Sequence, residues 1–368
     1  MSIVNRQLSF FPAPFETFFI ILHQNSLNPL SMITRPHFFP AIILWMMVIL
    51  TGIREIGRAA PTTPDKSLHS IESVIVAGSP ISDHLGNVVG ITIPLKRAGR
   101  LFLLEATIDQ QSGNFILDTG ASGLVLNKTY FRESIVFDDM EGGGVTGTTG
   151  QVSRVKVKHM QVSDFSFDNV LADVTQLGHL ENRRGVKILG LFGMAMLKNF
   201  QMVIDLHNSE LQLFRLDKNG NSLDPNAAVV KFDMIQKIDE FHNVMFVKAT
   251  IGGKILDFCL DTGAESNVVS IDSPKKVMNT ITITRRSGLI GVGSARGDVL
   301  YGILNDFTMG NRQIHAMETI LCSLADMSQQ YAYPIDGMLG YDFFSRGKIY
   351  LNIVKKEMGI CLKTEETP

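Results

Sequence analysis

The chain has 368 residues, a formal net charge of −2 and 45% hydrophobic residues, so it is long enough for two domains with separate cores. Its near-zero charge and scattered basic residues give no support for a nucleic-acid partner or for binding to an anionic membrane surface. The sequence contains no H-E-x-x-H zinc motif, no G-x-S-x-G nucleophile elbow and no phosphate-binding P-loop, so these catalytic classes have no support.

An apolar run of fifteen residues, 38–52, lies near the start of the chain, between Arg35 and Arg54. Its length is short for a membrane span and typical of the apolar region of an export signal. Residues 1–60 are therefore predicted to be either an export signal or an N-terminal anchor. Both alternatives place the remaining chain outside the cytoplasm, in the periplasm or the extracellular space.

The first strong motif is Asp118-Thr119-Gly120-Ala121, and the same four letters return as Asp261-Thr262-Gly263-Ala264. The offset is 261 − 118 = 143 residues. Ten of the twenty-seven positions in 101–127 are identical to those in 244–270 without a gap. A repeat at so long a period indicates duplicated domains rather than a solenoid.

Glycine-rich segments follow both motifs, at 142–150 and at 288–297. Each precedes a run of residues that favour strands, and glycine tolerates the positive φ angles of tight hairpin turns. We predict two mobile hairpin tips, which are named the flaps below. The glycines expected to matter most in them are Gly144, Gly147, Gly291 and Gly293.

A hydrophobic-hydrophobic-Gly segment recurs as the third landmark. Gly193 lies 193 − 118 = 75 residues after the first aspartate, and Gly340 lies 340 − 261 = 79 residues after the second. Alternating stretches at 202–206 and 348–352 follow these glycines. The alternation predicts the closing strand of each half.

Four features follow one another in the same order in both halves: a strand, Asp-Thr-Gly-Ala, a glycine hairpin and a hydrophobic-hydrophobic-Gly segment. This order resembles that of the retropepsin-like aspartic proteases. The two-copy chain is similar to bacterial aspartyl protease family proteins that fuse two such units. The resemblance covers residues 90–362. It implies an all-β fold in which two retropepsin/pepsin-like lobes, with closed or partly closed β-barrels, face a central cleft.

The repeat and the resemblance together set the predicted domain boundaries. They are an N-terminal extension at 61–89, a first lobe at 90–217, a linker at 218–228, a second lobe at 229–362 and a tail at 363–368. Because one chain carries both lobes, we expect it to work as a monomer.

The resemblance implies that Asp118 and Asp261 are the catalytic pair of an aspartic endopeptidase, which acts on a peptide or protein substrate and needs neither metal nor cofactor. Two carboxylates about 3 Å apart cannot both ionise, so they share one proton. The other motif residues are expected to support this pair: Thr119, Gly120, Ala121, Thr262, Gly263 and Ala264.

The two motifs differ in the residue that follows them, which is Ser122 in the first and Glu265 in the second. The halves are therefore not interchangeable, and the site is predicted to be asymmetric. Glu265 either contacts the substrate or forms an ion pair.

Three cysteines are present, and no C-x-x-C motif supports zinc or thioredoxin chemistry. Cys259 is predicted to be a small core residue, while Cys322 and Cys361 either pair or stay free. Asn127-Lys128-Thr129 matches a glycosylation sequon.

Two other functions remain open from the sequence. The duplicated fold could hold a peptide without cutting it, as a binding module. It could also be a protease that acts only on itself or on one membrane protein. Intact aspartates in both motifs favour catalysis, because a buried pair of carboxylates is costly for a fold that does not use it.

Overall fold

The computed structural model describes residues 82–83, 89–132, 136–140, 152–178, 180–181, 185–224, 230–290, 296–325, 327–328 and 333–363. All of these residues lie in one compact unit within His37–Pro368. The predicted export signal or anchor at 1–60 lies outside the described residues, as does most of the extension at 61–89. Within the described part, no helix combines the length and the apolar character that crossing a membrane requires.

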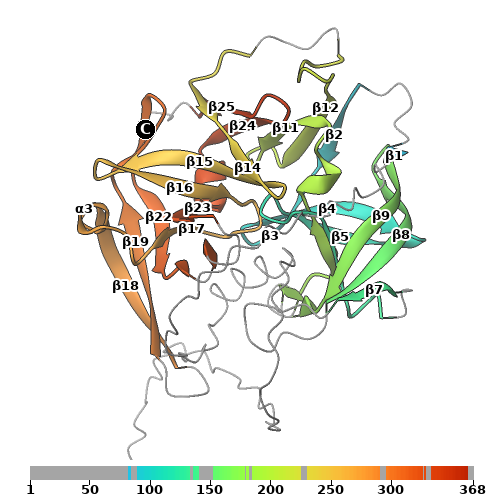
Figure 1. The fold of residues 1–368 in the computed structure, drawn as a ribbon, viewed down its shortest axis with the longest axis horizontal. Coiled ribbons are helices and arrows are strands. Elements are labelled where there is room, and N and C mark those ends of the chain that lie inside the picture. The colour runs from blue at the N-terminus through green and yellow to red at the C-terminus, as the bar shows by residue number, and fades with distance from the viewer. Residues whose placement is uncertain are drawn as a thin grey trace, which may run out of the picture. The chain divides into compact units, whose positions relative to one another are not determined.

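A nine-stranded sheet, the first-half sheet, leads to and surrounds the first motif. Its strands are β1 (Ser82–Asp83), β3 (Lys96–Ala98), β4 (Leu101–Ile108), β5 (Gln111–Leu117), β6 (Leu124–Asn127), β7 (Val136–Met140), β8 (Val152–Val162), β9 (Phe165–Thr175) and β10 (Ile188–Phe192). β8 and β9 pair with each other as well as with the two ends of the path β6-β10-β5-β4, so six of these strands close into a ring. These strands run from cyan to green in Figure 1.

A ten-stranded sheet, the second-half sheet, repeats this arrangement around the second motif. Its strands are β14 (Asp239–Phe241), β15 (Val244–Ile251), β16 (Lys254–Leu260), β17 (Asn267–Ser270), β18 (Ile281–Ile290), β19 (Arg296–Leu304), β20 (Phe307–Met309), β21 (Arg312–Ile314), β22 (Met317–Cys322) and β23 (Gly337–Leu339). The strands that correspond to the ring follow one another in the order β19-β22-β17-β23-β16-β15-β20. Among the described strands of this half, β19 and β20 do not pair with each other, so the ring stays open.

A six-stranded sheet, the joint sheet, takes three strands from each half. Its members are β2 (Gly90–Pro94), β11 (Phe200–Asp205), β12 (Glu210–Arg215), β13 (Met234–Lys237), β24 (Gly347–Asn352) and β25 (Glu357–Leu362). The two predicted closing strands, β11 and β24, pair antiparallel at its centre. Main-chain hydrogen bonds therefore connect the halves directly.

The repeat is more regular in the structure than in the sequence. β4 and β15 begin and end at the same offset of 143 residues, and both alternate buried and exposed positions in the same order. The hairpin strands β3 and β14 also obey this offset, although their sequences differ. The pattern of burial, more than residue identity, carries the duplicated fold.

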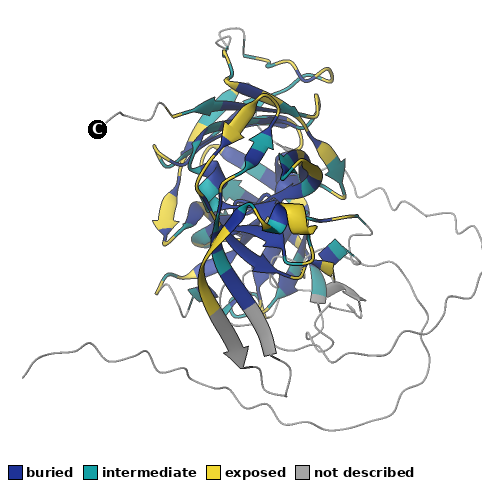
Figure 2. Ribbon diagram, turned by 90° about the vertical axis from the view of Figure 1, so that its left-hand side faces the viewer, coloured by how far each residue is buried: buried dark blue, intermediate teal, exposed yellow. Residues whose placement is uncertain are grey.

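Helices are short within the described residues. They include the 3₁₀ turn η1 (Met194–Met196) and the α-helical turns α3 (Lys275–Met278) and α5 (Tyr341–Phe344). Figure 2 shows buried segments in dark blue through the interior strands and exposed segments in yellow along margins and turns. The predicted all-β class is confirmed.

The core contains several of the residues that the sequence singled out. Cys259 is buried, as predicted for a small core residue. Cys322 and Cys361 are both free thiols. Asn127 of the sequon is fully buried, and its side-chain amide donates a hydrogen bond to the carbonyl of Ile188 at 2.9 Å. In this fold the amide is therefore not accessible for glycosylation.

Candidate active site

The two motifs lie at equivalent strand ends. β5 ends at Leu117, immediately before Asp118, and β16 ends at Leu260, immediately before Asp261. β10 and β23 run parallel to these strands, and their last residues accept the aspartate N–H groups. The distances are 3.1 Å from Asp118 N to the Phe192 oxygen and 2.9 Å from Asp261 N to the Leu339 oxygen. The predicted hydrophobic-hydrophobic-Gly segments therefore fix the main chain at each aspartate.

The motif threonines tie the two loops to each other. The main-chain N–H of Thr119 donates to Thr262 Oγ1 at 3.1 Å, and the N–H of Thr262 donates to Thr119 Oγ1 at 3.0 Å. Each hydroxyl then donates to the opposite strand, Thr119 to the Leu260 oxygen at 2.9 Å and Thr262 to the Leu117 oxygen at 2.8 Å. Because all four bonds are buried and reciprocal, they set the separation of the two halves at the aspartates.

The motif glycines allow each loop to approach the opposite aspartate. A Cβ built on Gly120 would lie 2.7 Å from Cγ of Asp261, and one built on Gly263 would lie 2.8 Å from Cγ of Asp118. A side chain at either position would push the opposite carboxyl group away. The two aspartates are thus in close contact with each other's loops.

Both carboxyl groups are buried and accept main-chain hydrogen bonds. Asp118 Oδ1 accepts the N–H groups of Gly120 and Ala121, both at 3.0 Å. Asp261 Oδ1 accepts the N–H of Gly263 at 2.7 Å. These bonds orient the carboxyl groups and favour their ionised forms.

Burial outweighs those bonds and raises the pKa of both groups. For Asp118, burial and then the negative charge of Asp261 hold the pKa well above its ordinary value. For Asp261, burial raises the pKa to about 6, against the opposing effect of the N–H groups of Gly263 and Ala264. Since the groups interact, the protons belong to the pair. The pair therefore keeps one proton at pH values where an ordinary aspartate is ionised.

The second oxygen of Asp118, Oδ2, is buried, and no group among the described residues donates a hydrogen bond to it. A proton shared by the two carboxyl groups would satisfy this oxygen, because it makes one group a donor to the other.

The motif alanines are buried at equivalent positions. The carbonyl of Ala121 accepts the N–H of Met194 at 2.9 Å, and the carbonyl of Ala264 accepts the N–H of Tyr341 at 2.9 Å. Each bond joins a motif loop to the residue after the landmark glycine of its own half. The alanines thus lie within the framework that holds the aspartates.

Two residues that the sequence did not single out touch the motif loops from the opposite half. Arg100 Nη1 donates to the carbonyl of Glu265, and Asn243 Nδ2 donates to the carbonyl of Ser122, both at 3.4 Å. The Arg100 guanidinium also forms an ion pair with Glu318 at 2.7 Å. Glu265 itself is half-buried and close to Gly99, whose built Cβ would lie 3.3 Å from Glu265 Oε1. Whether Glu265 contacts a substrate stays a prediction.

The predicted flap glycines Gly144, Gly147, Gly291 and Gly293 lie outside the described residues. The strands on either side of both glycine segments pair antiparallel, β7 with β8 and β18 with β19, as a hairpin requires. Residues 288–290 and 296–297 of the second glycine segment belong to β18 and β19, and residues 291–295 lie outside the described residues.

Two cavities in the described part of the chain lie away from the aspartates. The larger, of about 600 Å³, is in the first half against β4 and β8 and is lined by residues such as Ile108, Phe131 and His159. Neither it nor the second cavity is lined by Asp118 or Asp261. The chemistry of the pair, not the size of a cavity, identifies the candidate site.

Residues 104–196 match the family model described as Aspartyl protease. The predicted relationship to aspartic proteases is confirmed by this match, which includes Asp118; Asp261 enters through the internal repeat. No curated protein matches the sequence. Solved structures with a similar arrangement include the aspartic proteinase from Irpex lacteus, 12% identical, with a TM-score of 0.46 over 76% of this chain and 98% of that one. Another, described as edgp, is 11% identical, with a TM-score of 0.43 over 74% and 94%. Similarity this distant carries no argument about chemistry.

Proposed function

We propose that this chain is an aspartic endopeptidase that hydrolyses peptide bonds with a water molecule activated by Asp118 and Asp261. The observation that carries the proposal is the reciprocal bonding of Thr119 and Thr262, which brings two buried carboxyl groups from duplicated loops into one place. The aspartyl protease match over the first motif supports it.

The chemistry follows from the shared proton. The ionised carboxyl group takes a proton from water as that water attacks the scissile carbonyl carbon, and the protonated group donates to the carbonyl oxygen. The tetrahedral intermediate then collapses when the leaving nitrogen gains a proton from the pair. Because the two carboxyl groups titrate together, the roles of base and acid belong to the pair rather than to one residue.

We expect an activity optimum that is mildly acidic to near neutral. Cleavage needs one ionised and one protonated carboxyl group, so activity rises as the pH passes upward through the lower pKa of the pair and falls above the higher one. The pKa of about 6 at Asp261 places the acidic limb near pH 6, and the still more strongly raised pKa of Asp118 keeps a proton on the pair at higher pH. A profile of kcat/KM against pH measures this.

Serine substitutions at the motif alanines provide the control for the pH profile. A hydroxyl at position 121 or 264 could donate to the adjacent ionised carboxylate, which lowers its pKa. Ala121→Ser or Ala264→Ser should therefore move the acidic limb to lower pH. A wild-type optimum below the ordinary pKa of aspartate, or an unmoved limb in both variants, contradicts the explanation.

The competing function is a peptide-binding module that does not cut. The burial of two interacting carboxyl groups argues for catalysis. Their raised pKa values show that the ionised form of each group is unfavourable in this place, and a site that only binds peptide does not need such groups. A generic peptide library, incubated with the full chain and with Asp118→Asn, tests the proposal. Library cleavage by the wild type alone supports it. Binding of library peptides with no product, and no self-cleavage by mass spectrometry, refutes it.

We also propose that the protease works outside the cytoplasm, in the periplasm or the extracellular space. The basis is the apolar segment 38–52 between Arg35 and Arg54, read as an export signal or as an anchor. Fractionation of cells that express the full chain tests this proposal. N-terminal sequencing of the product distinguishes a cleaved signal from a retained anchor.

A further inference from the structure

The two hairpins before the motif strands reach across to opposite motif loops. β3 and β4 form one hairpin, with Arg100 at its turn, and β14 and β15 form the other, with Asn243 at its turn. Arg100 and Asn243 occupy equivalent positions, since 243 − 100 = 143. Arg100 holds the carbonyl after the second motif, and Asn243 holds the carbonyl after the first.

Arg100 makes several contacts on its side. Besides its bond to the carbonyl of Glu265, its Nη2 lies 2.7 Å from Glu318 Oε2, and its guanidinium carbon lies 5.4 Å from the centre of the Tyr341 ring. The main-chain N–H of Tyr341 holds the carbonyl of Ala264. The carbonyls of Ala264 and Glu265 thus accept hydrogen bonds from Tyr341 and Arg100, which pack against each other in one cluster.

First-half residues hold the Tyr341 ring in this cluster. Arg97, on β3, donates from Nη2 to the Tyr341 hydroxyl at 3.0 Å. The ring of Phe102, on β4, stacks on Tyr341 with 6.0 Å between centroids and 13° between planes. The Arg97 guanidinium lies over both rings. A cation over an aromatic face is favourable, so the cluster joins the first-half hairpin to the second motif loop.

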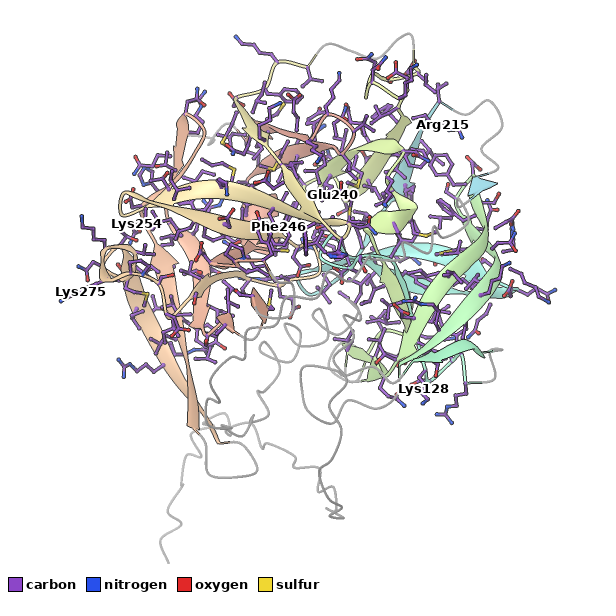
Figure 3. The ribbon with its side chains drawn as sticks, in the orientation of Figure 1. Lys128, Arg215, Glu240, Phe246, Lys254 and Lys275 are labelled. Carbon is purple, nitrogen blue, oxygen red and sulfur yellow. The ribbon has the colours of Figure 1, made fainter. Side chains whose placement is uncertain are left out.

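The equivalent place on the other side is built differently. Asn243 is a neutral donor, and the carbonyl of Ser122 that it contacts also accepts the main-chain N–H of Ala195 from its own half, at 3.0 Å. Arg97 corresponds to Glu240, which is labelled in Figure 3, and Phe102 corresponds to Met245. Glu240, Asn243 and Met245 line the second, smaller cavity. The first motif loop therefore has support that does not depend on Asn243.

We infer that Arg100 is a positioning residue for Asp261. Arg100 holds the second motif loop at the distance from Asp118 that the shared proton requires. This inference rests on the proposed function. The Arg100 side chain is 40% exposed, so its ion pair with Glu318 contributes little to overall stability. Its effect comes from the geometry of the loop, where a displacement of about 1 Å can lower the rate by up to about a hundredfold.

Arg100→Met and Asn243→Gly form the matched test. Methionine keeps much of the length of the side chain but removes the charge and the donors. Glycine at 243 tolerates the left-handed φ of 66° that Asn243 adopts. We expect kcat to fall about tenfold in Arg100→Met with little change in KM, and to stay within about twofold of the wild type in Asn243→Gly. Equal losses in both variants, or full kcat in Arg100→Met, overturn the inference.

Titration of the aspartate carboxyl groups by NMR gives a readout that does not depend on cleavage. The titratable group that acts on Asp261 is Asp118 on the facing loop, whereas Cys259, on the strand that leads to Asp261, has its own pKa raised by burial and by the two aspartates. If loss of Arg100 loosens the loop, the Gly263 bond that lowers the pKa of Asp261 weakens, and the lower pKa of the pair rises. We expect this rise in Arg100→Met and not in Asn243→Gly. An unchanged titration in Arg100→Met contradicts the inference.

The same experiments separate failure of this inference from failure of the proposed function. If the wild type cuts neither library peptides nor itself, the proposed function fails, and the titration alone judges the role of Arg100. If Arg100→Met does not fold, Arg100→Lys replaces it, because lysine keeps the charge beside Glu318 but cannot reproduce the guanidinium fork. A kcat below the wild type is then expected in Arg100→Lys, and a kcat equal to the wild type overturns the inference.

Discussion

Replacing either Asp118 or Asp261 by Asn is expected to lower kcat for peptide cleavage by at least about a thousandfold. Asparagine keeps the size and the hydrogen-bonding oxygen of the side chain but can neither ionise nor release a proton. Each single variant destroys the shared-proton pair, so the double variant should lose little more than either single one. Single-turnover and steady-state rates on one cleavable peptide measure this effect.

Stability supplies the control for the aspartate variants. The pKa of both carboxyl groups is raised in the folded chain, so their protonation favours folding at low pH and that contribution is lost as the pH rises through the folded pKa. Above pH 6 the pair carries one unfavourable buried charge, and Asp261→Asn removes it while Asp118, whose pKa is raised further, keeps its proton. We expect Asp261→Asn to unfold at a higher denaturant concentration than the wild type near neutral pH. Substantial residual cleavage in either folded single variant contradicts the assignment of the pair.

Alanine at the landmark glycines is expected to cost about 3 kcal/mol or more of unfolding free energy. A Cβ on Gly193 would lie 2.2 Å from the Gly123 oxygen, and a Cβ on Gly340 would lie 2.5 Å from the Ser266 oxygen. These are main-chain atoms of the motif loops, which cannot rotate away as a flexible side chain can. Gly193→Ala and Gly340→Ala should therefore lose both stability and activity, as measured by denaturant unfolding and by kcat.

Gly123→Ala is the matched control, in the motif loop that Gly193 packs against. A Cβ there would meet Ala195 Cβ at 3.8 Å, an ordinary contact, and the glycine does not adopt a positive φ. We expect its unfolding free energy to stay within about 1 kcal/mol of the wild type. Similar losses in the control and in Gly193→Ala would show that the landmark glycines are not special.

The sequence could predict the paired motifs because duplication leaves a record in the chain itself. The residues around Asp118 and Asp261 are identical at many positions when the two halves are aligned without a gap. This similarity indicates that the two aspartates follow equivalent strands, without any knowledge of the tertiary structure. Alternating hydrophobicity also predicts closing strands close to β11 and β24. It cannot predict that these two strands pair with each other, because alternation fixes which face of a strand is buried and not which strand lies beside it.

The contacts around Arg100 could not be predicted for a different reason. Arg100 and Asn243 occupy equivalent positions but share no residue type, so the repeat gives no signal there. The sequon at Asn127 shows the opposite case, in which a local pattern is present but the fold does not use it. Three matching letters indicate a surface site, whereas the fold uses that side chain to bond the buried main chain beside β10. In both cases tertiary contacts decide the role of a residue.

The most direct test of the central claim mixes full chains of Asp118→Asn and Asp261→Asn in equal amounts and measures cleavage of a peptide that the wild type cuts. Because the proposed site takes Asp118 and Asp261 from one chain, the mixture should be as inactive as either variant alone. The wild-type rate per mole should also stay constant on dilution. Recovery of cleavage in the mixture, together with a wild-type rate per mole that falls on dilution, would contradict a complete site within one chain.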